Sequence, residues 1–197
     1  MKRLFILMLG VILIMGGCHG PSDSYDKNYI VKIFDFELSP DEEKIAFSAL
    51  TPIGNTDIWV VDINGKNLKK LTFKDRSASN HIARFFKKYK LNDYFEIDMH
   101  SPKWTKDGRI LFCQKLSRHT LWDVYTVKLK NLTIRPDGTG AKAATSADEP
   151  TKKEIRGPVN IFKAFELSEK HKKKIFLRDN NLWYSDENNS VPRLLIQ

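Results

Sequence analysis

The stretch from Phe36 to Phe73 reads FELSPDEEKIAFSALTPIGNTDIWVVDINGKNLKKLTF and contains the clearest structural pattern of the chain. Its apolar runs KIAFSA and DIWVVDI are rich in β-branched and aromatic residues, which favour extended strands. Two turn-like segments, PDEEK and INGK, border these runs, and the pair Asn64-Gly65 is a strong signal for a tight hairpin. The stretch therefore predicts four short antiparallel strands joined by hairpins.

The same pattern returns twice later in the chain. The second copy contains HSPKWTKDGRILF and WDVYTVKL, and the third contains IFKAFELSEKHKKKIFL and NLWYSDENNS. We expect equivalent positions to recur in these sets: Ser39, Thr105 and Ser168; Ile45, Ile110 and Ile175; Phe47, Phe112 and Phe176; and Trp59, Tyr125 and Trp183. The copies lie 63 to 66 residues apart, more than the about 40–45 residues of a four-stranded blade. We therefore expect insertions at about 73–97, 130–136 and 146–158.

A four-stranded unit cannot cover both of its faces alone, so repeated units of this kind stack face to face. The sequence therefore predicts an all-β fold. It would be a partial β-propeller of about three four-stranded antiparallel blades, over residues 31–73, 98–145 and 160–197.

One segment between the first two copies has a different period. Ile82, Phe85, Phe86 and Tyr89 follow the i, i+3, i+4, i+7 spacing of an amphipathic helix. This pattern predicts one short inserted helix near residues 80–90. The helix would pack over an edge of the sheets or, through its basic residues, contact a membrane or a partner.

The N-terminus has the features of an export signal. An apolar run from Leu4 to Met15 follows two basic residues and is too short to span a bilayer comfortably. The residues Met15, Gly16 and Gly17 before Cys18 resemble the lipobox of bacterial lipoproteins.

This resemblance implies a signal peptide over residues 1–17, a lipid on Cys18 that attaches the protein to a membrane, and a polar tether over residues 18–30. His19 follows the lipid site. The sorting rule of such lipoproteins then implies the periplasmic face of the outer membrane, if the cell is Gram-negative. The alternatives are an ordinary cleaved signal and an uncleaved anchor, each with an incidental cysteine.

The sequence motifs give no sign of catalysis. The chain has a formal charge of +9, but its one tight basic run, Lys170–Lys174, is typical of a solvated loop, so we expect no nucleic-acid partner. Gly-x-Ser-x-Gly and phosphate-loop motifs are missing from the sequence, and its five histidines lack close metal-ligand spacing. We therefore expect no catalytic residue, no cofactor and no metal ligand. Asp57 and Asp123 are expected to be structural, and Cys113 to be a buried thiol.

The repeats resemble those of TolB-like β-propellers, which read roughly Ser-Pro-Asp-Gly, a basic residue, Ile-Ala-Phe, Asp-Ile-aromatic and a closing Leu-Thr. Ser39, Pro40 and Asp41 match this pattern, whereas Glu42 replaces the glycine. The second copy keeps Asp-Gly in TKDGR, and the third copy loses the Pro-Asp-Gly turn. The resemblance covers most of residues 31–197 and implies the fold and protein partners in the periplasm.

Three blades leave two uncovered sheet faces, whereas propellers have four to eight blades around a channel. Self-association, a split or truncated chain, capping by the insertions and a hidden degenerate blade all remain open. We expect a non-catalytic cell-envelope lipoprotein that acts as a protein-binding or scaffold module. The alternatives are a fragment of a lyase-like or prolyl-oligopeptidase-like propeller, for which His100 and His119 are candidate residues, and a truncated propeller without independent function.

Overall fold

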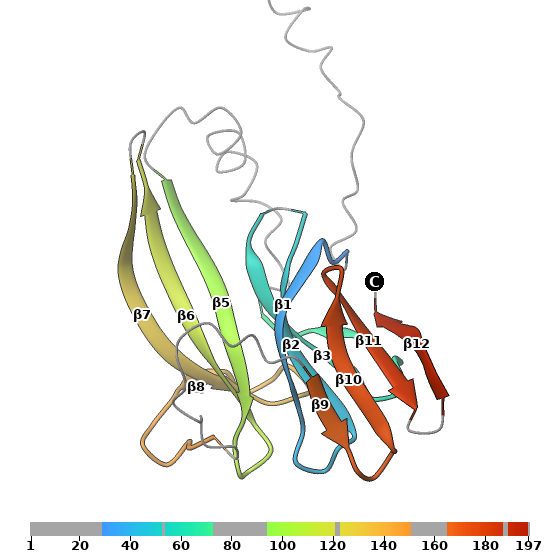
Figure 1. Cartoon of the computed structure of the whole chain (residues 1–197). Coiled ribbons are helices and arrows are strands. Elements are labelled where there is room, and N and C mark those ends of the chain that lie inside the picture. The colour runs from blue at the N-terminus through green and yellow to red at the C-terminus, as the bar shows by residue number, and fades with distance from the viewer. Residues whose placement is uncertain are drawn as a thin grey trace, which may run out of the picture.

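The computed structural model describes residues 29–52, 54–72, 94–120, 123–150, 165–186 and 189–196. Within these residues the fold is all-β, with three four-stranded antiparallel sheets that form propeller-like blades (Figure 1). The expected signal peptide, the lipid site Cys18 and the expected helix near 80–90 lie outside the described residues. In the part of the chain that is described, no helix is long and apolar enough to cross a membrane.

Each blade is a meander in which strands that follow one another in the sequence are hydrogen-bonded neighbours. Blade 1 consists of β1 (Lys32–Leu38), β2 (Lys44–Leu50), β3 (Thr56–Asp62) and β4 (Lys69–Lys70). Blade 2 consists of β5 (Tyr94–Trp104), β6 (Ile110–His119), β7 (Val124–Ile134) and β8 (Lys142–Ala143). Blade 3 consists of β9 (Phe165–Ser168), β10 (Lys173–Arg178), β11 (Asn181–Asp186) and β12 (Asn189–Ile196).

Blade 1 lies between the other two blades, although it comes first in the chain (Figure 1). Alternate side chains of a strand point to opposite sides of the sheet. Nearly all side chains of β2 and β3 are buried, so both faces of these strands are covered. One face packs on blade 3 through Ile45, Phe47, Ala49, Trp59 and Val61 against Ile175, Leu182, Leu195 and Ile196. The other face packs on blade 2 through Ala46, Ile58, Val60 and Leu71 against Met99, Trp104, Ile110, Phe112 and Ile134. The blades therefore follow the spatial order 2–1–3.

The hairpin between β3 and β4 is shaped by Gly65, as the Asn-Gly signal predicts. Gly65 has a φ of +81°, which favours glycine. A Cβ atom at this position would lie 3.0 Å from the carbonyl oxygen of Leu195 in β12. Glycine is therefore required both by the turn and by the close approach of blade 3.

One equivalence predicted for blade 2, that of Tyr125 with Trp59, differs in the structure. Phe112 pairs across the strands with Leu132, in the way that Phe47 pairs with Trp59. Tyr125 instead pairs with Arg118, near the far end of the long β6–β7 hairpin, and it is exposed. The prediction that Tyr125 is equivalent to Trp59 was wrong, because β6 and β7 extend beyond the length of the strands in blade 1.

Candidate functional site

Each of the three blades has a phenylalanine at the same position of its second strand. A hydroxyl residue closes the first turn of each blade opposite a basic residue: Ser39 and Lys44, Thr105 and Arg109, and Ser168 and Lys173. A phenylalanine follows three residues after each basic residue. The strand register therefore confirms that Phe47, Phe112 and Phe176 are equivalent.

In blade 1 this phenylalanine belongs to a buried aromatic pair. Phe47 lies across from Trp59 in β3, and the two rings stack with centroids 6.4 Å apart at an interplanar angle of 13°. Both side chains are 0% exposed, because blade 3 covers them. In blade 2 the equivalent Phe112 is buried against blade 1. A neighbouring blade therefore covers this position in blades 1 and 2.

Blade 3 has the same aromatic pair without the cover. Phe176 lies across from Trp183, at the positions that Phe47 and Trp59 hold in blade 1, but both residues are partly exposed. Their cross-strand neighbours Phe165 and Leu194 are 45% and 41% exposed. With Leu167, which is 56% exposed, these residues form an apolar surface across all four strands. We call the five residues Phe165, Leu167, Phe176, Trp183 and Leu194 the outer face of blade 3.

Two cations lie over the aromatic rings of this outer face. Lys174 Nζ is 4.3 Å from the ring centroid of Phe165, and Arg178 Cζ is 5.8 Å from the ring of Trp183. Trp183 Nε1 also donates a hydrogen bond to the Arg178 carbonyl oxygen at 3.0 Å. These cation–π contacts orient the side chains. The result is an apolar surface bordered by positive charge.

A second predicted equivalence, that of Ile175 with Ile45, also differs in the structure. The register opposes Lys173 to Ser168, so the residue that corresponds to Ile45 is Lys174 and not Ile175. Ile175 points to the opposite side of β10 and packs on blade 1. The prediction was one residue out, because the first turn of blade 3 does not preserve the spacing between serine and isoleucine that the sequences suggested.

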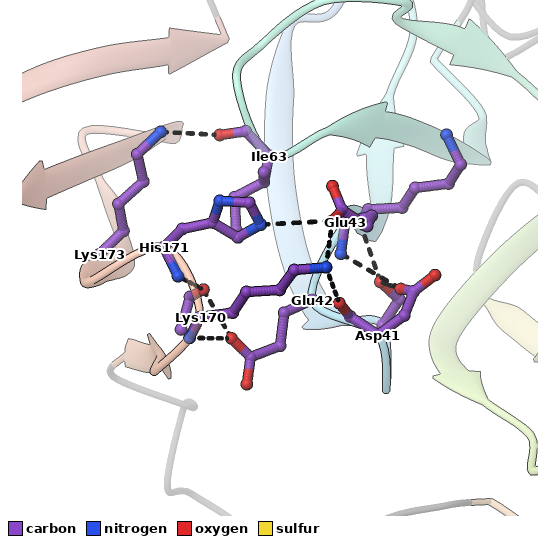
Figure 2. Close-up of polar contacts among 10 residues, drawn as sticks. Asp41, Glu42, Glu43, Ile63, Lys170, His171 and Lys173 are labelled. Atoms are coloured by element: carbon purple, nitrogen blue, oxygen red, sulfur yellow. Dashed lines mark hydrogen bonds and ion pairs between the residues drawn. The ribbon is translucent and has the colours of Figure 1, made fainter.

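The contact between blades 1 and 3 shows how two neighbouring blades meet at their turns (Figure 2). Glu42 in the first turn of blade 1 accepts hydrogen bonds from the Lys170 backbone nitrogen and from Ser168 Oγ, both at 2.8 Å. The Lys170 ammonium group contacts the Glu43 carboxylate, and His171 Nε2 lies 3.7 Å from the same carboxylate. An acidic turn of one blade therefore faces a basic turn of the next.

This turn contact changes two pKa values in opposite directions. The hydrogen bond from Lys170 lowers the pKa of Glu43, and the same bond raises the pKa of Lys170. Lys173 Nζ also donates to the carbonyl oxygen of Ile63 at 3.4 Å. The run Lys170–Lys174 therefore covers the exposed first turn of blade 3 and the start of β10, and two of its lysines, Lys170 and Lys173, also contact blade 1.

Asp57 and Asp123 have the structural roles that the sequence predicts. Asp57 is buried inside blade 1, where it pairs with Lys70 Nζ at 2.7 Å and accepts a hydrogen bond from Thr72 Oγ1 at 2.9 Å. Asp123 Oδ1 accepts a hydrogen bond from the Val124 backbone nitrogen at 2.7 Å. Asp123 thus binds the backbone at the start of β7 directly, whereas Asp57 holds Thr72, whose Oγ1 accepts a hydrogen bond from the Ile58 backbone nitrogen at 3.0 Å.

The three described histidines, His100, His119 and His171, and Cys113 do not form one site. His119 Nε2 lies 2.7 Å from Glu96 Oε2, whereas His100 lies further along β5, opposite Cys113. Cys113 is partly exposed rather than buried as expected. Among the described residues, no group of three or more histidine, cysteine, aspartate and glutamate side chains could hold a metal ion.

Sequence reasoning missed the polar contacts between the inner strands β1 and β5. Asp35 accepts a hydrogen bond from the Ser101 backbone nitrogen at 3.0 Å and contacts Ser48 Oγ. Trp104 Nε1 donates to the Glu37 carbonyl oxygen at 3.0 Å. Burial raises the pKa of Asp35, and the hydrogen bonds offset part of this effect. The alternation of acidic and apolar residues in FDFEL was the available signal.

Comparison with known proteins gives no sequence match and two weak structural similarities. No protein-family model matches the sequence, and no curated protein matches it. The structure is similar to that of a putative TolB from Agrobacterium tumefaciens, at 13% identity and a TM-score of 0.26, over 82% of this chain and 64% of that chain. It is also similar to TolB from Acinetobacter baumannii, at 13% identity and a TM-score of 0.24, over 79% of this chain and 40% of that chain. This chain thus spans less than two thirds of the length of either protein.

Proposed function

We propose that this protein is a non-catalytic binding module of the cell envelope, and that the outer face of blade 3 binds a protein partner. The observation that carries the proposal is the aromatic pair Phe176 and Trp183, which is partly exposed at positions where blade 1 has a fully buried pair. A contiguous exposed apolar surface is typical of a protein interaction site. Aromatic residues bordered by arginine are also typical of the residues that dominate binding energy.

The packing of blade 3 on blade 1 indicates the kind of partner. Blade 3 covers Phe47 and Trp59 with an apolar sheet face, so the equivalent residues of blade 3 fit a sheet face of the same kind. Lys174 and Arg178 border the surface, so a partner with carboxylates at the edge of its contact would be complementary. We therefore propose a partner with an apolar sheet face and an acidic rim.

A second copy of this chain is a poorer fit than a different protein. Blade 1 packs on blade 2 through apolar residues such as Ile58, and blade 3 packs on blade 1 through apolar residues such as Leu182 at the same position. The register places Asn131 at the same position in blade 2, opposite Cys113. Thr133 similarly replaces Val60, and its hydroxyl is buried under Arg109. Polar residues thus occupy two positions at which blade 1 has apolar residues, so blade 2 cannot repeat unchanged the contact that buries Phe47 and Trp59.

We also propose attachment to the membrane through a lipid on Cys18, which the motif before this residue supports. Localisation to the periplasmic face of the outer membrane would follow in a Gram-negative cell. Replacement Cys18→Ala should abolish metabolic labelling with a fatty acid and move the protein from the membrane fraction to the soluble fraction. Labelling that persists in this variant would contradict the lipid proposal and leave the binding proposal unaffected.

The binding proposal is tested by the size of the complex in solubilised cell envelopes. Full-length protein should migrate on a native gel with a single larger species, and Leu167→Asp should dissociate that species. The matched control is Leu129→Asp, which places the same charge at an exposed leucine of blade 2. The proposal fails if both variants behave alike, or if the wild-type protein forms no larger species.

A further inference from the structure

A groove of about 800 Å³ lies at one end of the contact between blades 1 and 2. Its residues come from the turn end of the two blades, opposite to the end where β1 begins (Figure 1). Blade 1 contributes Val60, the β3–β4 hairpin residues Asn67 and Lys69, and Lys44. Blade 2 contributes its β5–β6 turn and its β7–β8 turn. This volume is in the range of small-molecule sites.

The charges in the groove are unbalanced. Its cations are Lys44, Lys69, Arg109 and Arg135, and its acids are Asp107 and Asp137. Lys44 pairs with Asp62 at 2.5 Å. The other three cations form no ion pair with a carboxylate within 4 Å in the described parts of the chain.

The two acids of the groove are held within their own turns. Asp107 accepts a hydrogen bond from Thr105 Oγ1 at 2.5 Å. Asp137 accepts hydrogen bonds from the backbone nitrogen and from Oγ1 of Thr139, at 2.8 and 2.7 Å. These bonds lower the pKa of Asp137, with a weaker contribution from nearby Arg135 and Lys69. The acids therefore stabilise the turns and form no ion pair within 4 Å with Lys69, Arg109 or Arg135.

Arg109 is a buried cation with neutral partners. It is only 8% exposed. Its Nε donates to Thr133 Oγ1 at 3.1 Å, and its Nη2 donates to the carbonyl oxygens of Thr133 and Gly140. The carboxylate of Asp148 is hydrogen-bonded by Thr145 at 2.8 Å. These bonds lower the pKa of Asp148, with smaller contributions from the charges of Lys142 and Arg109, so Asp148 compensates part of the Arg109 charge without forming an ion pair with it. A buried charge that is only partly compensated is costly, so an anion beside Arg109 would be stabilising.

Two guanidinium groups converge on the same point. A Cβ atom built on Gly140 would lie 3.7 Å from Arg135 Cζ and 3.8 Å from Arg109 Nη1. Both guanidinium groups therefore lie beside Gly140, and an anion placed between them would reduce the repulsion between their charges. Arginine is also the side chain whose donor geometry best matches phosphate and carboxylate groups.

We infer that the groove between blades 1 and 2 binds the phosphate group of a small soluble molecule through Arg109, Arg135 and Lys69. A phosphate group is favoured over a singly charged anion, because it can neutralise more of the charge of three cations that have no carboxylate partner. A soluble source is favoured over a lipid headgroup, because the groove lies at the end of blade 1 opposite to residue 32, where the chain enters β1. This inference is independent of the binding proposed for blade 3.

The test is calorimetric titration of the full-length protein in detergent with pyrophosphate, and separately with inorganic phosphate. We expect saturable binding of pyrophosphate, with at least about a tenfold loss of affinity in Arg135→Gln and in Lys69→Gln, equivalent to about 1.4 kcal/mol each. The matched control is Lys128→Gln, which removes one exposed cation from β7 outside the groove. These variants leave the buried Arg109 unchanged, so a failure to fold is not expected.

Three results would overturn the inference. The first is the lack of saturable pyrophosphate binding. The second is an equal loss of affinity in Lys128→Gln, which would indicate general charge screening. The third is binding of the lipid-free Cys18→Ala protein to phosphatidylglycerol vesicles, lost in Arg135→Gln, without binding of pyrophosphate, which would assign the groove to a membrane headgroup.

Discussion

Phe176 lies directly across from Trp183 on the outer face of blade 3, in the relation that Phe47 has to Trp59 in the core of blade 1. One aromatic pair is fully buried by a neighbouring blade, and the other is partly exposed. The main difference between these equivalent positions is that a further blade covers only the first pair. This difference is the physical basis of the proposed function, and it makes the two pairs behave differently on substitution.

Truncation of the two tryptophans should have unequal effects on stability. Trp59→Ala removes a side chain that is 0% exposed, and we expect the free energy of unfolding to fall by about 3–5 kcal/mol. Trp183→Ala removes a partly exposed side chain, and we expect a loss of about 1 kcal/mol or less. Urea unfolding of the purified variants measures both. Equal losses would show that the outer face of blade 3 is already covered within a single chain.

Gly65 should tolerate a side chain less well than Gly108. Both have positive φ, at +81° and +74°, so alanine costs about 1–2 kcal/mol at either position. Only at Gly65 would the new Cβ also lie 3.0 Å from the Leu195 carbonyl oxygen, whereas nothing lies within 4 Å at Gly108. We expect Gly65→Ala to lower the melting temperature more than Gly108→Ala. The reverse order would contradict the close approach of blade 3 to this hairpin.

Asp35 should give the protein a distinctive dependence of stability on pH. Burial raises its pKa above the ordinary value of 3.8, so the folded state holds this proton to a higher pH than the unfolded state. Ionisation of Asp35 therefore lowers the free energy of unfolding as the pH rises from 3.8 through the raised folded pKa. We expect Asp35→Asn to gain stability relative to the wild type over that interval, as measured by urea unfolding at a series of pH values.

The control for Asp35 is Asp137→Asn, because the pKa of Asp137 is lowered and not raised. The ionised Asp137 contributes stability above the ordinary pKa of 3.8, and that contribution is lost as the pH falls through the lowered folded pKa. This variant should therefore lose stability relative to the wild type as the pH rises. A difference of the same sign in both variants would contradict the assigned shifts.

The purified protein should be a single chain in solution. The polar residues Asn131 and Thr133 of blade 2 replace the apolar residues that bury the equivalent contact in blade 1, so two copies should not close on each other. Light scattering during size-exclusion chromatography of the full-length protein, corrected for detergent, should give the mass of one chain. A stable dimer would favour self-association as the means of covering blade 3.

The sequence predicts the strands within each blade better than it predicts which blades pack on each other. Alternation and turn residues identify four-stranded units and the equivalence of Phe47 with Phe176, because these signals are local. The predicted equivalence of Tyr125 with Trp59 was wrong, because the length of a hairpin depends on cross-strand pairing, for which the sequence has no local motif. The contact of Glu42 with Ser168 joins residues 126 apart in the sequence. No local pattern predicts that the last blade lies beside the first, so the outer face of blade 3 could not be assigned from the sequence.

The most direct test of the proposed binding surface is photo-cross-linking in the intact envelope. A photoreactive phenylalanine analogue would replace Trp183 in one full-length variant and Leu129 in a control variant. We expect one discrete cross-linked product with a different envelope protein from position 183, lost when Lys174→Glu is added, and no such product from position 129. The same products from both positions, or no product from position 183, would contradict the account.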